Sequence, residues 1–283
     1  MHALMMIGLL MTANDPLPTG KSTFEAQFGQ DTLKLFAYKP KAYTNGPLIM
    51  VFHGVLRNAE EYRDDSVELG DRFGALIVAP LFDEKSFPKP RYQFGGIVRD
   101  GQSTPPDEWT GEFVNRITTL IRQREHRPDL PLYLIGHSGG GQFLIRLAAF
   151  VKTDAIRIVA ANPGTHLFPN KTAPFPFGLG GLPVELQTDE RLKFYLSQPL
   201  TIYLGTEDTE RDEHLDMTPP AEEQGRFRYE RGQNAFAAAK KLAAEHNWPF
   251  GWKLVIAKNI EHDHSKMFNN PQCAVALGLP ERK

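Results

Sequence analysis

The sequence of 283 residues predicts an α/β protein with a mostly parallel, doubly wound sheet. Short, nearly unbroken apolar runs of strand length recur along the chain, and helical stretches separate several of them. Two alternating segments precede the first run and predict an N-terminal antiparallel hairpin. Unbroken apolar runs are typical of strands that helices cover on both faces, so we expect a single α/β domain.

The boundaries of the expected elements follow from these patterns. The hairpin is expected at 22–28 and 32–38, because Gly29, Gln30 and Asp31 interrupt the alternation. The runs expected to form buried strands are 48–52, 75–79, 132–135, 156–161, 200–204 and 252–257. Helices are expected at 113–124, 142–151 and 234–245.

Two connections, 82–109 and 162–182, are long and rich in Pro, Gly and aromatic residues. Because loops of this length in a compact domain are commonly functional, we expect them to be lid-like. Residues of these loops and of the strand ends are candidates to line a substrate cleft: His53, Leu56, Tyr92, Phe94, His137, His166, Phe168, Phe175 and Phe177. The aromatic residues of the loops could equally pack as satellite core.

Composition excludes several classes of function. The formal net charge is −2, and nothing in the sequence suggests the basic surface of a nucleic-acid binder. Cys273 is the single cysteine, so no intramolecular disulfide can form, and its sequence context does not mark it as reactive. No segment approaches the roughly 20 apolar residues that a membrane span needs.

The N-terminus has two interpretations. Residues 3–11 are apolar, and Thr12 and Ala13 then lead into a polar, Pro-containing segment. This order fits a short signal peptide cleaved after Ala13, but no Lys or Arg precedes the apolar run, and a disordered tail fits equally. We expect the domain at 14–283. Export would make the protein periplasmic or secreted, and retention of the segment would leave it in the cytoplasm.

The run Gly-His-Ser-Gly-Gly at 136–140 matches the G-x-S-x-G pattern of a nucleophile elbow. It follows a buried strand and precedes a helix, which is the context that the pattern requires. Such an elbow strains the serine backbone and exposes its hydroxyl, and a Cβ at the flanking glycines would collide with the strand and helix. Ser138 is therefore the predicted nucleophile.

A serine nucleophile needs a base and an orienting acid, which in this fold follow it in the order acid, then His. Asp208 lies just past the strand expected at 200–204 and is the predicted acid. The loop also contains three competing carboxylates: Glu207, Asp212 and Asp216.

His262 and His264 follow the last predicted strand, and either could be the base. Metal binding by this pair finds no matching third ligand motif, so we expect neither a metal nor a cofactor.

The oxyanion hole requires two convergent N–H donors. Gly139, the residue after the nucleophile, should supply one of them. The loop that begins with His53 and Gly54 should supply the other, from Val55 or alternatively from Leu56. Gly54 would allow the backbone to approach the substrate closely.

With these motifs, the chain resembles the α/β-hydrolase superfamily, and within it bacterial esterases related to polyhydroxyalkanoate depolymerases and feruloyl esterases. The matching runs are 53–59, 136–140, 205–208 and 260–263, with Met267 and Phe268 behind the last. The resemblance implies that His262 is the base, because His264 falls where relatives have a small residue. Glu261 replaces the usual Gly, and the absence of disulfides departs from many exported depolymerases, which weakens the transfer of their polymer substrate.

The expected activity is hydrolysis of a carboxylic ester by Ser138, His262 and Asp208 through an acyl-enzyme. Amide, polyamide or polyester hydrolysis would use the same groups, so the substrate is a small-molecule or polymeric ester or amide. C–C bond hydrolysis and acyl transfer are further reactions of such a site. A binding protein on this scaffold would be expected to lack a triad member, and here all three are present. The oligomeric state is not predicted.

Overall fold

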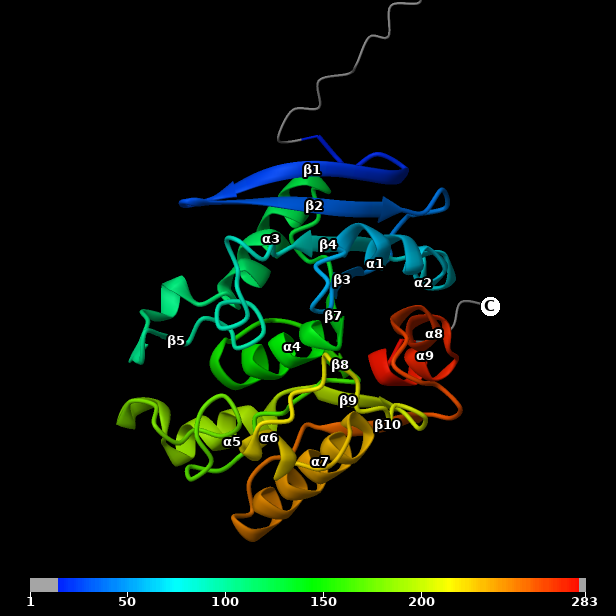
Figure 1. The fold of residues 1–283 in the computed structure, drawn as a ribbon. Coiled ribbons are helices and arrows are strands. Elements are labelled where there is room, and N and C mark those ends of the chain that lie inside the picture. Colours follow the sequence, from blue (N-terminus) through cyan, green and yellow to red (C-terminus); the bar gives the residue numbers. More distant parts are fainter. Residues whose placement is uncertain (1–14, 280–283) are drawn as a thin grey trace, which may run out of the picture.

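The computed structural model describes residues 15–279, so the candidate signal segment 1–13 lies outside the described residues. Eight strands form one sheet in the order β1-β2-β4-β3-β7-β8-β9-β10 (Figure 1). Their bounds are Gly20–Phe28, Asp31–Lys39, Leu76–Leu81, Leu48–Phe52, Leu132–His137, Arg157–Ala161, Leu200–Gly205 and Lys253–Ala257, in that order. Only β1 and β2 run antiparallel to their neighbours, and every other pairing is parallel. The predicted α/β-hydrolase fold is confirmed.

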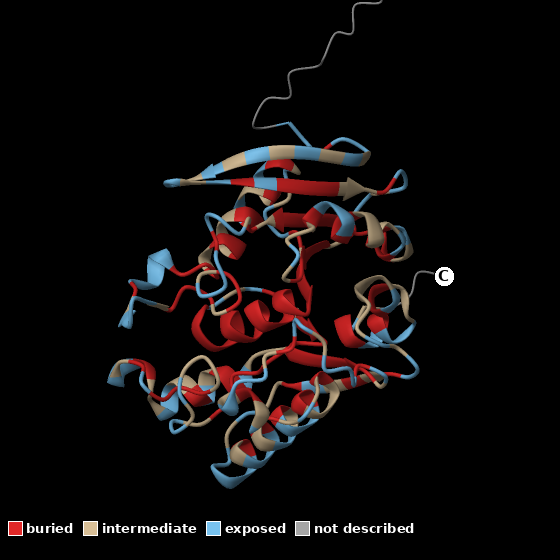
Figure 2. Cartoon of the chain, viewed as in Figure 1, coloured by how far each residue is buried: buried red, intermediate tan, exposed pale blue. Residues whose placement is uncertain are grey.

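The hairpin forms where the alternation predicts it. Phe28 pairs with Asp31 across a two-residue turn, and β1 alternates between half-buried and exposed positions along its whole length. It is therefore an edge strand with one face toward solvent (Figure 2). The strands β3, β7 and β9 are buried throughout, as the unbroken apolar runs indicate.

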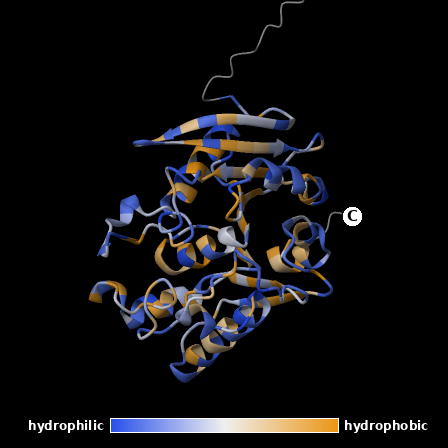
Figure 3. Cartoon of the chain, viewed as in Figure 1, coloured by the Kyte–Doolittle hydropathy of each residue, from blue (hydrophilic) through white to orange (hydrophobic). Residues whose placement is uncertain are grey.

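Helices cover both faces of the sheet, and the side chains of each strand alternate between them. On one face Met50 and Leu134 pack in a core with α3 (Glu112–Arg124), α4 (Gly139–Phe150), α5 (Asp189–Ser197) and α7 (Arg228–Glu245). On the other face Val51 and Ile135 pack against α1 (Ala59–Asp65), α2 (Val67–Phe73), α8 (His264–Asn269) and α9 (Gln272–Leu277). Hydrophobic residues concentrate in the central strands and the helix surfaces that face them (Figure 3).

The two long connections are fastened to the domain. The first contains the short strands β5 (Val98–Arg99) and β6 (Gln102–Ser103). Its Tyr92 is fully buried and stacks on Phe82, with 5.0 Å between ring centroids, as the satellite-core alternative predicts. The second connection is held by Arg146 of α4, which donates to Thr165 O and Pro176 O at 3.1 and 2.7 Å.

The remaining elements are short. They are the α-helix α6 (Pro219–Glu222) and two 3-10 helices, η1 (Pro106–Glu108) and η2 (Val184–Leu186). Within residues 15–279, no helix has both the length and the apolar character needed to cross a membrane.

Candidate active site

The turn between β7 and α4 is a sharp elbow. Ser138 has φ 55° and ψ −117°, a backbone conformation that residues with side chains rarely adopt. Its N–H donates to Ala161 O of β8 at 2.9 Å, which fixes the turn against the next strand. A Cβ on Gly136 would lie 2.6 Å from Gly140 O, and one on Gly140 would lie 2.2 Å from Phe52 O. Both positions therefore require glycine, which is the steric reason that the sequence pattern indicates.

The loop after β3 lies against this elbow. A Cβ on Gly54 would lie 3.6 Å from Ser138 Cβ and 3.9 Å from its Oγ. A Cβ on Gly139 would lie 3.3 Å from Val55 N. The structure thus brings the two predicted oxyanion donors, Gly139 and Val55, together beside the serine, while the neighbouring Leu56 has its side chain in solvent.

Tyr62 of α1 connects this loop to the elbow. Its hydroxyl lies 3.3 Å from His137 Nδ1, and it is close enough to Gly54 that a Cβ there would be 3.0 Å away. Burial raises the pKa of Tyr62, so the phenol stays protonated and can donate to the imidazole. The hydroxyl therefore helps to fix the position of the loop after β3, which carries Gly54 and Val55 and is called the oxyanion loop below, relative to the elbow.

Asp208 and His262 meet at the ends of β9 and β10. His262 Nδ1 lies 2.7 Å from Asp208 Oδ2, and the carboxylate is fully buried. The His262 ring is also 4.4 Å, centroid to centroid, from His137, the residue before Ser138. Since Nδ1 is engaged with Asp208, Nε2 is the ring nitrogen of His262 that is left free to accept a proton.

The three competing carboxylates have other partners. Asp212 is bound by Arg228 through two contacts of 2.7 and 2.8 Å. Asp216 binds Lys89 at 3.3 Å, and Glu207 accepts a hydrogen bond from the neighbouring Thr206 hydroxyl.

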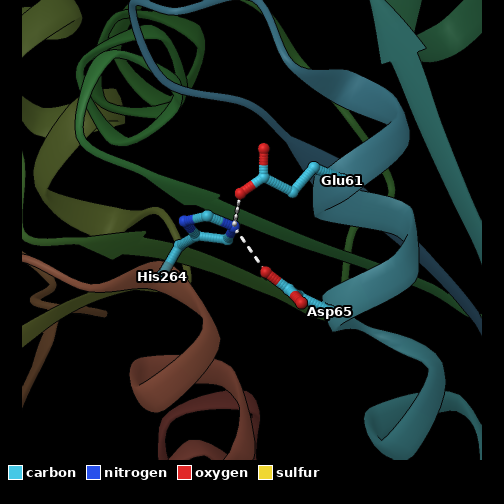
Figure 4. Close-up of side chains that lie close together, drawn as sticks. All are labelled: Glu61, Asp65 and His264. Carbon is cyan, nitrogen blue, oxygen red and sulfur yellow. Dashed lines mark ion pairs between the residues drawn. The ribbon is translucent and has the colours of Figure 1, made fainter.

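His264 faces Glu61 and Asp65 of α1 (Figure 4). Its Nε2 lies 2.8 Å from Asp65 Oδ2 and 3.9 Å from Glu61 Oε1, and its ring stacks on Tyr62 at 3.9 Å. Burial lowers the pKa of His264, although the two carboxylates oppose that effect. Of the two candidate histidines, the structure therefore brings only His262 to Asp208.

Glu61, Asp65 and His264 are also the residues within 15–279 whose side chains could together hold a metal ion, with ligand atoms within 4.8 Å of one another (Figure 4). In this structure the three side chains contact one another directly, with His264 Nε2 closest to Asp65 Oδ2. Glu61 lies on the exposed side of this group.

Two histidines near Ser138 are buried and neutral. Phe82 N–H donates to His53 Nε2 at 3.1 Å, and burial lowers the pKa of His53 to about 3. Burial also lowers the pKa of His137 well below its usual value. These imidazoles therefore serve as uncharged supports under the oxyanion loop and the elbow.

The predicted cleft residues divide into three groups, one of which is half-buried and consists of Phe94, Phe168, Phe175 and Phe177. Leu56 is 69% exposed, next to the oxyanion loop. The side chains of His53, Tyr92, His137 and His166 are buried, so they do not line an open cleft. They were singled out for lying in loops and at strand ends, and that pattern does not distinguish a buried anchor from an exposed contact. His166, for example, is fastened by its backbone to the Gln224 side chain at 2.9 and 2.7 Å.

Sequence reasoning missed Asn162, which lies at the end of β8. Its Oδ1 accepts from Gly205 N at 2.8 Å, and its Nδ2 donates to Glu261 O at 3.3 Å. One buried side chain thus links the loop that carries Asp208 to the loop that carries His262. Its place directly after a buried parallel strand is the signal that could have identified it.

Comparisons with solved structures find hydrolases of the same fold. The chain is 33% identical to the poly(3-hydroxybutyrate) depolymerase LpqC of Bordetella parapertussis, with a TM-score of 0.85 over 93% of this chain and 92% of that one. It is 32% identical to poly(aspartic acid) hydrolase-1 of Sphingomonas sp. KT-1, with a TM-score of 0.85 over 92% and 99%. An α/β serine hydrolase of Xanthomonas campestris, 15% identical with a TM-score of 0.50 over 95% and 100%, shares the fold. No model of a known family and no curated protein matches the sequence.

Proposed function

This chain belongs to the α/β-hydrolase superfamily of serine hydrolases, and from that premise we propose that it cleaves a carboxylic ester through Ser138, His262 and Asp208. The observation that carries these roles is the 2.7 Å contact between His262 Nδ1 and Asp208 Oδ2 on an imidazole beside the elbow. The strained backbone of Ser138 supports its role as the nucleophile.

In the first half-reaction, Ser138 Oγ bonds to the ester carbonyl carbon while His262 Nε2 takes the hydroxyl proton. The carbonyl oxygen becomes an oxyanion, and the N–H groups of Gly139 and Val55 donate to it. Asp208 stabilises the imidazolium that forms. The carbon–oxygen bond to the alcohol then breaks, His262 gives its proton to the leaving oxygen, and the acyl-enzyme remains.

In the second half-reaction a water replaces the alcohol. His262 takes a proton from the water, whose oxygen bonds to the acyl carbon and forms a second oxyanion in the same hole. The bond to Ser138 Oγ breaks, and the proton on His262 returns to that oxygen. The carboxylic acid leaves, and the enzyme is restored without any cofactor in these steps.

The two similar hydrolases are named for a polyester and for a polyamide. We favour an uncharged ester for this chain because of two features near the site. Leu56 offers an exposed apolar surface next to the Val55 donor. The loop that carries Asp208 also exposes Glu207, Glu210 and Glu213, which would repel a polyanion such as poly(aspartic acid).

Labelling with a fluorophosphonate probe tests the nucleophile. We expect the native protein to be labelled and Ser138→Ala to be unlabelled. Ser197→Ala, which changes an exposed serine at the end of α5, is the matched control and should label like the native protein. Equal labelling of Ser138→Ala and the native protein would overturn the assignment.

Two histidine variants test the base. We expect His262→Ala to lower kcat for a short-chain aryl ester by about 10⁴-fold, and His264→Ala to stay within about tenfold of the native rate. Inactivity of His264→Ala with an active His262→Ala would reverse the assignment. Oligomers of 3-hydroxybutyrate and of aspartate, compared at equal concentration, test the substrate class, and faster cleavage of the aspartate oligomers would refute the preference for an uncharged ester.

A further inference from the structure

Arg228, the first residue of α7, reaches the acid of the proposed triad. Its guanidinium is fully buried and lies between two carboxylates. Nη1 is 3.5 Å from Asp208 Oδ1, on the side of the carboxylate away from His262. The start of α7 is also tied to the same loop by its backbone, because Tyr229 N donates to Asp208 O at 3.2 Å.

The two terminal nitrogens of Arg228 bind Asp212, whereas its buried Nε has no hydrogen-bond partner among the described residues. Nη1 and Nη2 contact the two oxygens of Asp212 at 2.7 and 2.8 Å, which is a bidentate pair. These hydrogen bonds are the main reason that the pKa of Asp212 falls to about 2, so Asp212 stays ionised at any pH where the enzyme would work. Arg228 therefore touches Asp208 only through the long contact, and Asp208 Oδ2 remains on His262.

The charges form a row in which His262, Asp208, Arg228 and Asp212 alternate in sign once the imidazole is protonated. Without Asp212, the two terminal nitrogens of Arg228 could both bind Asp208 and compete with His262 for that carboxylate. The full positive charge of Arg228 would also oppose the imidazolium that forms in the reaction. Without Arg228, two carboxylates would be left close together with no cation between them.

We propose that Arg228 and Asp212 together are a positioning pair, in which Arg228 holds Asp208 toward His262 and Asp212 neutralises the guanidinium so that the acid remains available to the base. This inference rests on the proposed function, because it assigns a role relative to the proposed triad. Neither residue contacts the reacting atoms in this arrangement.

The other ionisable groups around His262 have partners or are neutral. His137 is uncharged because of its burial, and His264 is paired with Asp65 and Glu61. The remaining groups of the His262 loop, Glu261 and Asp263, both contact Lys266. The charges of Arg228 and Asp212 can therefore be removed one at a time without breaking the ion pairs that Lys266 makes in the loop that carries His262.

The pH dependence of kcat/KM for a soluble aryl ester tests the proposal, because its acid limb reports protonation of the base in the free enzyme. Asp212→Asn removes a negative charge, so the acid limb should move to lower pH by roughly half to one unit. Arg228→Met removes a positive charge, so the limb should move to higher pH by a similar amount. The plateau of both variants should fall about tenfold or more, because Asp208 is no longer held on His262.

Glu213→Gln is the matched control. It removes one negative charge from an exposed residue next to Asp212 that does not contact Arg228. Its profile should stay within about 0.2 pH unit of the native one, since an exposed charge is screened by solvent and salt. Fluorophosphonate titration of active sites corrects every rate for protein that fails to fold.

Opposite shifts of the limb in Asp212→Asn and Arg228→Met support the positioning pair. If the acid limb of kcat/KM for Asp212→Asn lies at the native pH, and the probe labels that variant fully, the positioning role is refuted and the pair has a structural role only. Because Asp212 is part-exposed and the replacement is nearly isosteric, this result does not depend on whether Arg228→Met folds. Labelling that does not depend on Ser138 would instead refute the proposed function, so the two failures are distinguishable.

Discussion

Replacing Gly140 with alanine tests how the elbow is packed. The added Cβ would lie 2.2 Å from Phe52 O, and 2.8 Å from His53 O. Ordinary van der Waals contact begins at 3.4 Å, and both oxygens belong to backbone that cannot swing aside. The start of α4 must therefore move about 1 Å away from β3. We expect this overpacking to lower the free energy of unfolding by about 2 kcal/mol.

The same movement should lower activity. A shift of the α4 start carries Gly139 N–H away from Val55 N–H, and the two could no longer converge on one oxyanion. A displacement of about 1 Å in a catalytic group costs on the order of 100-fold in rate, and we expect a loss of that size in kcat/KM for a short-chain aryl ester. Urea denaturation measures the stability, and active-site titration separates the rate effect from loss of folded enzyme.

Gly141→Ala is the matched control for this prediction. It adds the same methyl group one residue later in α4, where the nearest atom, Ala161 O, would be 3.0 Å away. The neighbour needs to yield by only a few tenths of an ångström, so we expect a loss of less than about 1 kcal/mol. Gly140→Ala with native stability and a rate within threefold would refute the reasoning, and so would equal damage in the two variants.

Three further positions give separate tests. Tyr62→Phe leaves the buried His137 Nδ1 without its partner, so kcat/KM should fall about fivefold and the free energy of unfolding by about 1 kcal/mol, whereas an unchanged rate would contradict the positioning role of Tyr62. Asn162→Ala leaves buried Gly205 N–H without its partner, so urea unfolding should show a loss of about 2 kcal/mol, and a native midpoint would count against it. Burial lowers the pKa of both His53 and His166 from 6.5 to about 3. The unfolded chain therefore binds more protons than the folded one between these values, and stability should fall as pH drops below 6.5, by about 2 kcal/mol for each histidine at pH 5. A His166→Gln variant should lose less stability between pH 7 and 5 than the native protein, and an identical loss would contradict this attribution.

The sheet could be predicted from the sequence because its signals are local. The apolar run 48–52 is the strand β3 to the residue, and the hairpin differs from its expected bounds by at most two residues. A strand buried on both faces has few polar positions, so its apolar run has nearly the length of the strand. The position of Ser138 is equally local, because strand, glycine turn and helix are consecutive in the chain.

The start of α7 could not be predicted in the same way. The expected helix begins at residue 234, but α7 begins at Arg228. Its first turns bury Arg228 and Arg231 where an amphipathic helix would have apolar side chains. A periodicity of apolar residues does not detect a buried face made of arginines, so the partner of Asp208 and Asp212 was missed together with the helix turn that carries it.

The choice between His262 and His264 also depends on distant contacts. Both follow the same strand at similar spacing, and the resemblance to esterases alone favoured His262. What separates them in space is α1, whose Asp65 and Tyr62 engage His264. That helix was not among the expected elements, because 59–65 is short and strongly charged.

The order of strands in the sheet has a consequence for the synthesis of this protein. The loops that carry Ser138, Asp208 and His262 meet only when β9 and β10 have docked beside β8, and β10 follows the other strands of this sheet along the chain. A nascent chain that has already formed the elbow still lacks His262, because that residue lies after β10. Hydrolase activity should therefore appear only once β10 has been synthesised and has docked, and a chain that stops before β10 should be a poor hydrolase.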